Sequence, residues 1–400
     1  MKTENGKWKT VKLGDIFDLQ MGKTPDRKKL DYFQGSHKWI SIADISKSEK
    51  YISETKEYLT DDAIASSGIK SIPKDTLIMS FKLSIGKTAI TSDEMYSNEA
   101  IMAFLSNGKY ETDNSFLYHL FSNKDWSEGS NKAVKGITLN KASLSEAKIS
   151  LPPLETQKHI AAVLDKCTAL IAKHKLMLEK YDTLIKSRFI EMFGDPVQNP
   201  MGWEVKKLGK MCSAIMNGTT PKGGEQVYVE KGITFLRSQN VWRNKIDLDD
   251  VAYIDEATHK SMKKSSLKKY DILMTKTGRI NTENSSLGRA ALFLGEDDSA
   301  NINGHVYLIR LEKEYNHEFV IRILTSPEYR DYIRSICVGG IDKRQVNKDH
   351  IEEFPIIQPP KELQDEYSTF VQQIDKSKFE IWRYLKFSDI MKRIGFILYD

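Results

Sequence analysis

The sequence predicts an α+β protein with two similar domains, separated by two long helices that form an antiparallel coiled coil with pseudo-twofold symmetry. Three observations lead to this prediction. The second half of the chain repeats the first, each copy opens with short strand-like segments, and each copy ends in a helix with an apolar heptad pattern. At 400 residues the chain also exceeds the usual size of one compact core.

The internal repeat is the strongest of these signals. Trp8, Gly22 and the pair Thr24-Pro25 are echoed 195 to 196 residues later by Trp203, Gly218 and the pair Thr220-Pro221. The offset reaches 207 where Pro152-Pro153 matches Pro359-Pro360. Part of this growth lies between Met274 and Gly288, where the second copy carries a longer polar loop. The two copies therefore differ most at a loop.

Short mixed segments open each copy, and runs such as Leu77-Ile78-Met79 and Val306-Tyr307-Leu308-Ile309 are typical of strands. A change of texture follows each proline pair, where proline suits a first helical turn. We therefore predict one globular domain over residues 1–150 and a second over 195–355. The spacer helices are predicted at 151–194 and 356–400.

Apolar residues in the first helix follow alternating steps of four and three, which indicates a coiled-coil seam. Its members are Ile160, Leu164, Cys167, Ile171, His174, Leu178, Tyr181 and Ile185. The second helix shows a looser pattern, with Ser377 at one seam step, made of Tyr367, Phe370, Ile374, Ile381, Tyr384, Met391, Ile394 and Leu398. A helix from Glu155 to Met192 would be about 57 Å long, too long for the inside of one domain, so we expect a spacer.

Composition restricts the class of protein but does not identify it. The net charge of +5 and the pI of about 8.7 permit a nucleic-acid partner without proving one. The sequence shows neither a signal-peptide pattern nor an apolar run long enough to cross a membrane, so we expect a cytoplasmic protein without a membrane partner. Three widely spaced cysteines fit a reducing compartment.

Motifs for catalysis are lacking, and we predict no catalytic residue and no metal site. No two glycines are separated by a single residue, which excludes a GxGxxG phosphate loop. Gly86-Lys87-Thr88 resembles the end of a Walker A loop, but Phe81 stands where its first glycine would be. One nuclease-like arrangement stays open as an alternative, with Asp26, Glu54 and Lys56 around magnesium.

Two motifs carry a resemblance to a known family: Trp8-Lys9-Thr10-Val11-Lys12-Leu13-Gly14 at the start, and Leu151-Pro152-Pro153-Leu154-Glu155-Thr156-Gln157 before the first helix. With two domains and two helices, the whole chain resembles the specificity subunit of Type I restriction-modification systems. The second junction departs from the pattern, because Pro359-Pro360-Lys361-Glu362 has no leucine before its glutamate.

This resemblance implies a non-catalytic subunit with two target-recognition domains. Each domain would read one half of a bipartite, asymmetric site in double-stranded DNA, and the helices would act as a ruler. The implied partners are two methylation subunits and the motor-nuclease subunits. S-adenosylmethionine, ATP and magnesium would be bound by those partners, and no cofactor is expected in this chain.

Direct readout requires Arg, Lys, Asn and Gln on loops that face a groove, while Ser, Thr and Lys position the phosphates. In the first domain the candidate DNA contacts are Lys23, Thr24, Arg27, Lys82, Ser84, Lys87, Lys135, Thr138 and Asn140. In the second they are Thr220, Lys222, Arg237, Gln239, Asn240, Lys276, Thr277, Arg279, Asn281, Lys343, Arg344 and Gln345. A lysine-rich run at 260–279 fits either a phosphate-tracking surface or a solvated turn.

Two other functions remain open at this point. A duplicated-domain coiled-coil scaffold that binds proteins and never DNA would have the same composition. A nuclease built on Asp26, Glu54 and Lys56 would cut DNA in the presence of magnesium. Salt-dependent DNA binding favours a DNA reader over the scaffold, because phosphate contacts release counterions.

Overall fold

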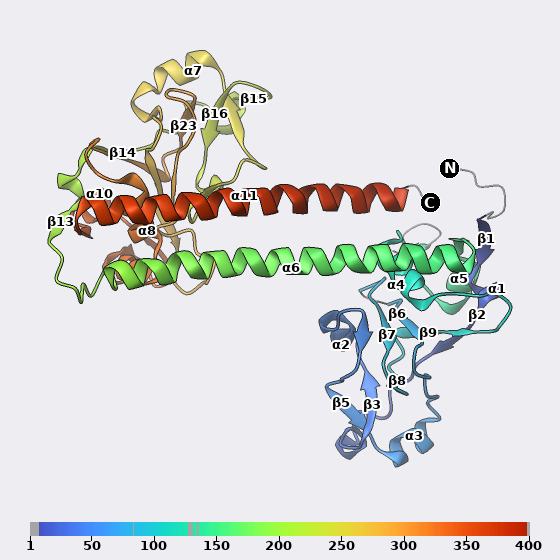
Figure 1. Ribbon diagram of the computed structural model, residues 1–400. Coiled ribbons are helices and arrows are strands. Elements are labelled where there is room, and N and C mark those ends of the chain that lie inside the picture. The colour runs from blue at the N-terminus through green and yellow to red at the C-terminus, as the bar shows by residue number, and fades with distance from the viewer. Residues whose placement is uncertain (1–7, 83, 127–130, 134–135, 398–400) are drawn as a thin grey trace. The chain divides into compact units, whose positions relative to one another are not determined.

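The structure is a computed structural model that describes residues 8–82, 84–126, 131–133 and 136–397. The chain forms two compact units (Figure 1). Unit 1 contains the residues up to Leu176 together with those from Trp382 onward, and unit 2 contains Met177–Ile381. Both long helices are thus divided between the units, and each unit is described by itself.

A five-stranded sheet forms the centre of unit 1. In hydrogen-bonding order its strands are β2 (Phe17–Met21), β9 (Ile101–Ser106), β6 (Leu77–Ser80), β7 (Thr88–Thr91) and β4 (Tyr51–Ile52). The first four strands pair antiparallel, and β4 joins parallel to β7. All four residues of β6 are buried, which explains its continuous apolar sequence.

The two faces of this sheet pack against different partners, as the alternation of side chains along a strand requires. Leu77 and Met79 share a core with Phe116 and Phe121 of helix α4 (Asn114–Asn123). Ile78, on the opposite face, belongs to the core of a second layer. That layer contains the small sheet β5 (Glu57–Leu59), β3 (His37–Ile40) and β8 (Tyr96–Ser97), with α2 (Ile42–Lys47) and α3 (Asp61–Ser67).

Seven shorter elements complete the described part of unit 1 apart from its portions of the two long helices. Strand β1 (Lys9–Lys12) pairs antiparallel with β12 (Lys148–Leu151), the strand that leads into the first long helix. Between them along the chain lie α1 (Leu13–Ile16), the 3₁₀ turn η1 (Leu30–Phe33), the hairpin β10 (Asn131–Ala133) and β11 (Gly136–Thr138), and α5 (Lys141–Glu146).

Unit 2 repeats this architecture with the same order of four main-sheet strands, without a counterpart of β4 in that sheet and with one more strand in the second sheet. Its main sheet is β14 (Cys212–Asn217), β24 (Val306–Leu311), β20 (Ile272–Thr275) and β22 (Ala290–Leu292). Its second sheet is β15 (Tyr228–Val229), β19 (Ala252–Ile254), β16 (Ile233–Leu236) and β23 (Ala300–Ile302). The parallel pair β3·β8 of unit 1 returns as the parallel pair β16·β23. The predicted duplication of an α+β domain is therefore confirmed.

The remaining elements of unit 2 follow a similar plan with additions, which include helix α9 (Pro327–Ile336) and a strand in the inserted loop. The remaining elements include β13 (Val205–Lys207), β27 (Pro355–Ile357), the hairpin β17 (Val241–Trp242) and β18 (Lys245–Ile246), and the helices α7 (Glu256–Ser261), α8 (His317–Thr325), α9 and α10 (Lys348–Glu352). Short 3₁₀ turns lie at η2 (Leu208–Lys210), η3 (Gly224–Val227), η4 (Ser238–Asn240) and η5 (Lys263–Ser265). The strand in the inserted loop is β21 (Thr277–Arg279).

The repeated glycines have a steric reason. Gly22 and Gly218 each follow the first strand of the main sheet, where two backbones approach closely. A Cβ atom at Gly22 would overlap the carbonyl oxygen of Ser97, and one at Gly218 would overlap those of Ile302 and Asn303. No residue with a side chain fits at this place, so the repeat keeps glycine here in both copies.

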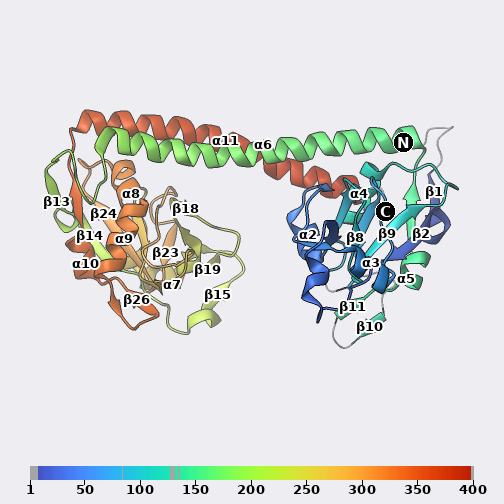
Figure 2. The same cartoon turned by 90° about the horizontal axis from the view of Figure 1, so that it is seen from below.

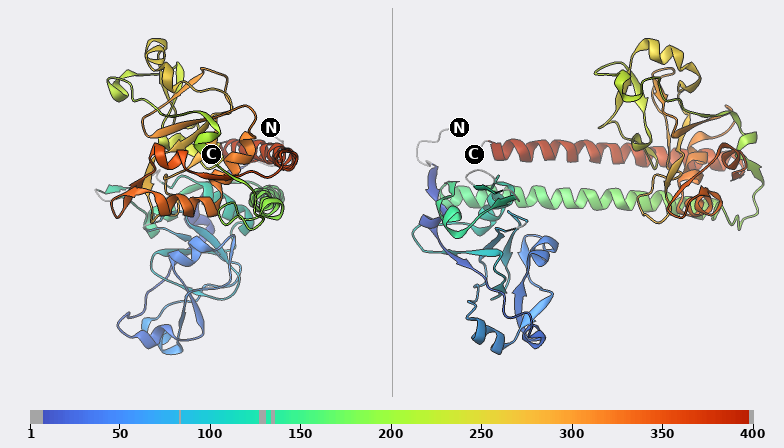
Figure 3. Two further views of the ribbon diagram at one scale, coloured as in Figure 1. Left: turned by 90° about the vertical axis from the view of Figure 1, so that its left-hand side faces the viewer. Right: turned by 180° about the vertical axis from the view of Figure 1, so that it is seen from behind.

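The two long helices are α6 (Leu154–Phe193), with 40 residues, and α11 (Lys361–Ile397), with 37 residues. Each is one continuous helix in Figures 1 and 3. At 1.5 Å per residue, α6 is about 60 Å long. The predicted seam residues of α6 are buried or half-buried, whereas Val163, Leu170, Leu176 and Leu184 on other faces are exposed. The expected long spacer helix is thus present.

Within unit 2 the helices run antiparallel. Arg188 of α6 contacts Glu366 of α11 at 2.9 Å, and Asp182, earlier in α6, contacts Lys378, later in α11, at 2.5 Å. The Tyr367 hydroxyl donates to the carbonyl of Ile185 at 3.3 Å. Ile374 is buried and Ile381 half-buried, while Ser377 is exposed and Val371 is fully buried instead. The seam of α11 therefore runs through Tyr367, Val371, Ile374 and Ile381, and Ser377 lies outside it.

In unit 1 the ring of His174 meets the edge of Tyr384 with a centroid distance of 4.8 Å. Tyr384 remains 44% exposed, so this contact covers only part of its ring. The side chain of Met391, another predicted seam residue, lies outside the described residues, as does Leu398.

A glutamine occurs at the start of each long helix, as Gln157 and Gln364, and it has a structural role in both copies. Gln157 is fully buried; its amide donates to the carbonyl of Pro152 at 2.8 Å, and its oxygen accepts from the amide of Asp113 at 2.9 Å. Gln364 donates to the carbonyl of Pro359 at 2.8 Å. These bonds satisfy backbone groups at the junction between domain and helix, where an unpaired buried group would be costly.

Charged groups also attach each helix to its domain. In unit 1 Asp165 of α6 binds Lys50 at 2.6 Å and His119 of α4 at 2.7 Å. Burial opposes ionisation of Asp165, but these two hydrogen bonds outweigh it and hold the pKa of the carboxyl below its ordinary value. In unit 2 Arg322 of α8 binds Asp375 of α11 at 3.1 Å.

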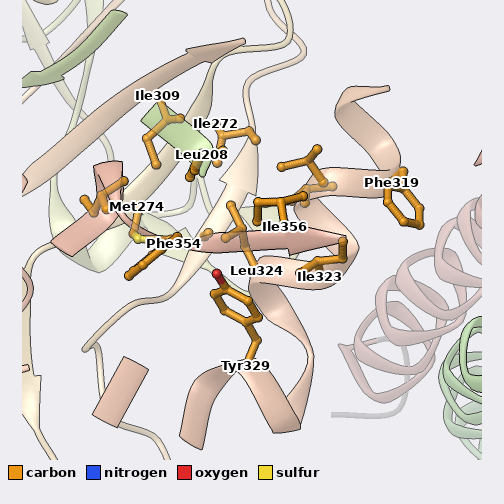
Figure 4. Close-up of a cluster of buried hydrophobic side chains, with 14 of the residues drawn as sticks. Leu208, Ile272, Met274, Ile309, Phe319, Ile323, Leu324, Tyr329, Phe354 and Ile356 are labelled. Atoms are coloured by element: carbon orange, nitrogen blue, oxygen red, sulfur yellow. The ribbon is translucent and has the colours of Figure 1, made fainter. Parts of the chain in front are cut away.

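The core of unit 2 includes residues from both long helices. Phe189 and Phe193 of α6 pack with Phe319 of α8 and Tyr367 of α11, with ring centroids 4.9 to 5.8 Å apart. Figure 4 shows the neighbouring part of this core, where Tyr329 lies among apolar side chains that include Phe354.

Among the described residues, no helix combines the length and the apolar character that a membrane crossing needs.

Candidate nucleic-acid interface

In unit 1 the structure brings two of the predicted loops together around Glu99. Thr24, just after β2, donates a hydrogen bond to the Glu99 carboxylate. That bond, together with the nearby charges of Lys82 and Arg27, lowers the pKa of Glu99. Residues from two distant parts of the sequence, before β3 and after β6, therefore lie close to one carboxylate.

Arg27 is held firmly by its own domain. It makes a bidentate pair with Glu57, at 2.6 and 2.9 Å, and its guanidinium lies over the rings of Phe33, at 4.1 Å, and Trp39, at 4.6 Å. A DNA contact through Arg27 would use the donors that this pair leaves. Lys23 is also occupied, because its ammonium donates to the carbonyl of Ser67 at 3.0 Å.

The turn between β6 and β7 presents the remaining predicted contacts of this region. Ser84 and Lys87 are exposed, and the Lys82 ammonium lies 5.3 Å from the ring of its neighbour Phe81. Lys87 has no side-chain hydrogen bond or ion pair with the described part of the chain. Of the predicted residues of this domain that the structure describes, it is the cation most available to a phosphate.

The third predicted segment of unit 1 is the β10–β11 hairpin, which lies on the side of the unit away from α6 in Figure 2. Lys135 and the side chain of Thr138 lie outside the described residues. Asn140 follows the hairpin and caps α5, since its side-chain oxygen accepts from the amide of Ser143 at 2.8 Å. Its position is thus fixed by a helix start, which is a structural task that the sequence prediction did not include.

In unit 2 the structure joins two predicted segments into one surface. Strand β21 pairs with β26 (Lys343–Gln345), which also pairs with β25 (Val338–Gly339), in a sheet of three strands. The register places Thr277 opposite Gln345 and Arg279 opposite Lys343. We call the side chains of Lys276, Thr277, Arg279, Lys343, Arg344 and Gln345 the β21–β26 surface. Figure 2 shows β26 on the side of unit 2 away from α11.

The β21–β26 surface is basic and loosely paired. Arg279 is exposed, and its only ion partner among the described residues is Asp342, at 3.8 Å. The Arg344 Nε atom is buried without a hydrogen-bond partner in the described part of the chain. Lys276 lies 5.7 Å from the ring of Tyr307, and Asn281 is exposed in the loop that follows β21. The two distant segments of the sequence thus place Arg279 and Lys343 on one face of this small sheet and Arg344 on the other.

The predicted trio after β16 has internal partners. Arg237 and Gln239 both bind the side chain of Asp250, at 3.2 and 2.7 Å. Asn240 is buried, donates to the carbonyls of Asp247 and Asp250, and accepts from the amide of Arg237. Asn240 therefore shapes the loop, Gln239 is exposed, and the Arg237 side chain is largely buried.

The other predicted residues of unit 2 lie on exposed loops. Thr220 and Lys222 follow Gly218 at the end of β14 and are exposed. Lys263, Lys264, Lys268 and Lys269 of the lysine-rich run are exposed as well, and Lys260 pairs with Glu256 at 3.4 Å. Exposure alone fits both a phosphate-tracking surface and a solvated turn.

The nuclease-like residues have separate partners. Glu54 accepts from the Tyr58 hydroxyl at 2.9 Å and lies 3.7 Å from Lys38, while Asp26 accepts from the amide of Lys28. Within the described ranges, no group of three or more His, Cys, Asp or Glu side chains is arranged to hold a metal ion.

Sequence reasoning missed a group of arginines beside the β21–β26 surface. Arg243, Arg289, Arg330 and Arg334 lie around the loop that connects β21 to β22. They come from a hairpin, a strand start and a helix, so no local motif joins them. The spacing of Arg330 and Arg334, one turn apart on α9, was the only available signal.

Comparison with known proteins gives a consistent result over both halves of the chain. The family model of the Type I restriction modification DNA specificity domain matches residues 5–180 and again 200–386. The MjaIX specificity subunit of Methanocaldococcus jannaschii is 26% identical over 387 residues, which cover 92% of this chain and 86% of that protein. The EcoR124I/EcoR124II specificity subunit of Escherichia coli is 25% identical over 171 residues, which cover 41% of each chain.

The fold has relatives among solved structures too. The Type-I restriction-modification system S subunit from M. genitalium superposes with a TM-score of 0.58 at 12% identity. The superposition covers 98% of this chain and 96% of that one. At this identity the likeness concerns the fold.

Proposed function

Since the chain belongs to the Type I restriction modification DNA specificity family, we propose that it selects the DNA site of a Type I restriction-modification complex and catalyses no reaction itself. Each α+β domain reads one half of a bipartite, asymmetric site in double-stranded DNA. The long helices hold the domains and dock two methylation subunits and the motor-nuclease subunits. S-adenosylmethionine, ATP and magnesium act in those partners.

One observation carries this proposal: the same domain occurs twice, with the same order of four main-sheet strands, and a long helix follows each copy. A reader of two unlike half-sites needs two domains of one fold with different surface loops. The copies differ in that way, because β21 of unit 2 is supplied by an insertion in the loop after β20.

The β21–β26 surface supplies the chemistry for reading in unit 2. Arg and Lys can donate to guanine in the major groove, and Gln345 can pair with adenine, while Thr277 suits a phosphate. Surface ion pairs such as Arg279–Asp342 contribute only about 0 to 1 kcal/mol, so DNA can replace the carboxylate at little cost. In unit 1 the turn with Ser84 and Lys87 supplies phosphate contacts.

The experiment is a reconstitution of the full chain with its methylation subunits. Sequencing the methylated bases of a genome exposed to this complex identifies the site, and we expect two unlike half-sites at a fixed spacing. The purified complex should bind a duplex with this site far more tightly than a scrambled duplex of equal length. Its affinity should also fall linearly with salt on a logarithmic scale.

A protein-binding scaffold is the second candidate, and the same preparation tests it. It would bind the methylation subunits without any salt-dependent affinity for either duplex. That result would contradict the proposed DNA-reading function. Cleavage of DNA by the isolated chain with magnesium would support the nuclease alternative instead.

A further inference from the structure

A polar cavity of about 550 Å³ lies in unit 2, beside the loop that connects β21 to β22. Trp242, Arg243, Arg289 and Arg330 are among the residues that line it. The lining holds four cations, counting Lys245, and two carboxylates, Asp247 and Glu283. Since Lys245 and Asp247 form their own pair at 3.5 Å, the arginines face an excess of positive charge.

Two of these arginines hold the shape of the loop. Arg289 donates from Nε to the carbonyl of Ser285 at 3.0 Å and from a terminal nitrogen to that of Asn284. Arg330 donates to the carbonyls of Thr282, at 3.3 Å, and Glu283. Each of them has one terminal nitrogen, Nη1, that makes no hydrogen bond with the described residues.

The orientation of Arg289 is also fixed by packing, because its guanidinium stacks on the ring of Trp242 at 3.8 Å and the residue is only 9% exposed. A buried, stacked guanidinium keeps its orientation and is prepared for a bidentate contact with a planar or tetrahedral oxyanion.

Unlike Arg289 and Arg330, Arg243 does not bind the carbonyls of the loop. Its side chain makes no hydrogen bond and no ion pair with the part of the chain that the structure describes. Burial, then the nearby charge of Arg334, lowers the pKa of Arg243. Burial, then the nearby charge of Arg243, likewise lowers the pKa of Arg289 and of Arg330. The guanidinium groups are therefore close enough to repel one another, and a bound anion would relieve that repulsion.

We infer that this cavity binds a phosphate group, with Arg243 as the residue that contacts it and Arg289 and Arg330 as the arginines that complete the site. A guanidinium fork matches the oxygens of a phosphate, and several of them around one cavity suit a dianion or a nucleic-acid backbone better than a carboxylate. The source that we propose is a backbone phosphate of duplex DNA next to the second half-site. This choice of source rests on the proposed function.

The position of the loop supports that source. The loop begins at Arg279 of the β21–β26 surface and passes the cavity four to six residues later, at Glu283, Asn284 and Ser285. A phosphate held in the cavity would thus lie close to the bases that Arg279 can read. Arg289 and Arg330, which bind carbonyls of this loop, would then couple a contact with the DNA backbone to the position of Arg279.

The test compares Arg243→Gln with the unchanged chain, each in the complex with its methylation subunits. Arg243→Gln should lower the affinity for the specific and the scrambled duplex about equally, by about tenfold, and reduce the salt slope by about one. Lys313→Gln is the matched control. It removes the same charge from an exposed position after β24. Lys313 lies near the end of the main sheet where Ile309 pairs with Ile272, whereas Arg289 lies near the opposite end, beside Thr275. The control should change affinity less than twofold.

Three outcomes decide the inference. A uniform loss with a reduced salt slope supports it, and an unchanged slope for Arg243→Gln overturns it. If the unchanged complex binds no duplex, the proposed function fails, and inorganic phosphate then tests the cavity alone. A rise of the melting temperature in phosphate over chloride at equal ionic strength, lost in Arg243→Gln, supports a phosphate site for another ligand. No such rise overturns the site itself.

Discussion

Removal of one aromatic ring, by Phe193→Ala, should separate helix α6 from the core of unit 2. Phe193 is fully buried at the last turn of the helix. Its ring packs against Phe189, Phe319 and Tyr367, with centroid distances of 5.1, 4.9 and 5.6 Å. These rings come from α6, α8 and α11, so this cluster joins both long helices to the second domain.

The expected loss follows from burial and ring contacts. Exposing a fully buried phenyl group costs about 2 to 3 kcal/mol in transfer free energy, and each lost aromatic contact adds about 0.5 to 1.5 kcal/mol. Partial relaxation of the cavity offsets some of that sum, and comparable substitutions cost about 3 to 5 kcal/mol. For a unit of this size, each kcal/mol lowers the melting temperature by about 2 to 4 °C.

Urea unfolding of the isolated chain, followed by near-ultraviolet circular dichroism, measures the change directly. Leu184→Ala is the control, because Leu184 lies on the same helix and is 46% exposed. We expect Leu184→Ala to cost less than about 0.5 kcal/mol. A loss below about 1 kcal/mol for Phe193→Ala would refute the packing argument, since the ring would then not hold the helix to the domain.

Four further predictions follow from the same geometry. Asp165→Asn should destabilise unit 1 by about 1 to 2 kcal/mol at neutral pH, because Lys50 loses its partner. The pKa of Asp165 is depressed in the folded state, so the stability difference between the unchanged chain and Asp165→Asn is present above the ordinary pKa of 3.8 and disappears as pH falls through the folded pKa. Denaturation of both chains at pH 7, 5 and 3 measures this difference. Gly218→Ala should cost about 1 to 3 kcal/mol in urea unfolding, whereas Gly304→Ala, whose Cβ would meet other atoms only at ordinary contact distances of 3.4 Å or more, should cost less than about 0.5 kcal/mol. Arg279→Ala should relax one base of the second half-site at a cost of about 1 to 3 kcal/mol; an unaltered pattern of methylated sites would remove this assignment. One heptad added to both α6 and α11 lengthens each helix by about 10 Å, so the spacing between the methylated half-sites should increase by about three base pairs. An unchanged spacing would contradict the proposal that the helices act as a ruler.

The repeat predicted the fold so well because its markers are steric necessities. Gly22 and Gly218 are fixed by close backbone approach, and Gln157 and Gln364 are fixed by carbonyls at the helix starts. Such requirements are local or nearly so, and they keep the same residue type at corresponding positions of the two copies. The seam of α6 was predictable for a related reason, since burial on one face of a helix imposes a fixed period.

The candidate contacts were less predictable, because the role of a polar residue depends on partners far away in the sequence. Arg27 meets Glu57 and the ring of Trp39, and Asn240 is buried beneath the loop of Asp247 and Asp250. Nothing near Arg27 or Asn240 along the chain distinguishes them from Arg279, which remains exposed. The same reason hides the arginine cavity, whose members become neighbours only when the hairpin of Arg243 and helix α9 have folded.

Three of the four predicted reading arginines have a carboxylate beside them: Arg27 contacts Glu57, Arg237 contacts Asp250, and Arg279 contacts Asp342. In the absence of DNA these carboxylates keep the guanidinium groups oriented and lower the local positive charge. They also compete with any phosphate, which weakens binding to arbitrary DNA. A base edge that offers two acceptors in the right geometry can replace the exposed carboxylate of Arg279, whose pairing is weak at 3.8 Å. It cannot easily replace Glu57, which binds Arg27 through two hydrogen bonds while two rings cover the guanidinium. Arg279 therefore suits base recognition, and Arg27 suits the positioning of its loop.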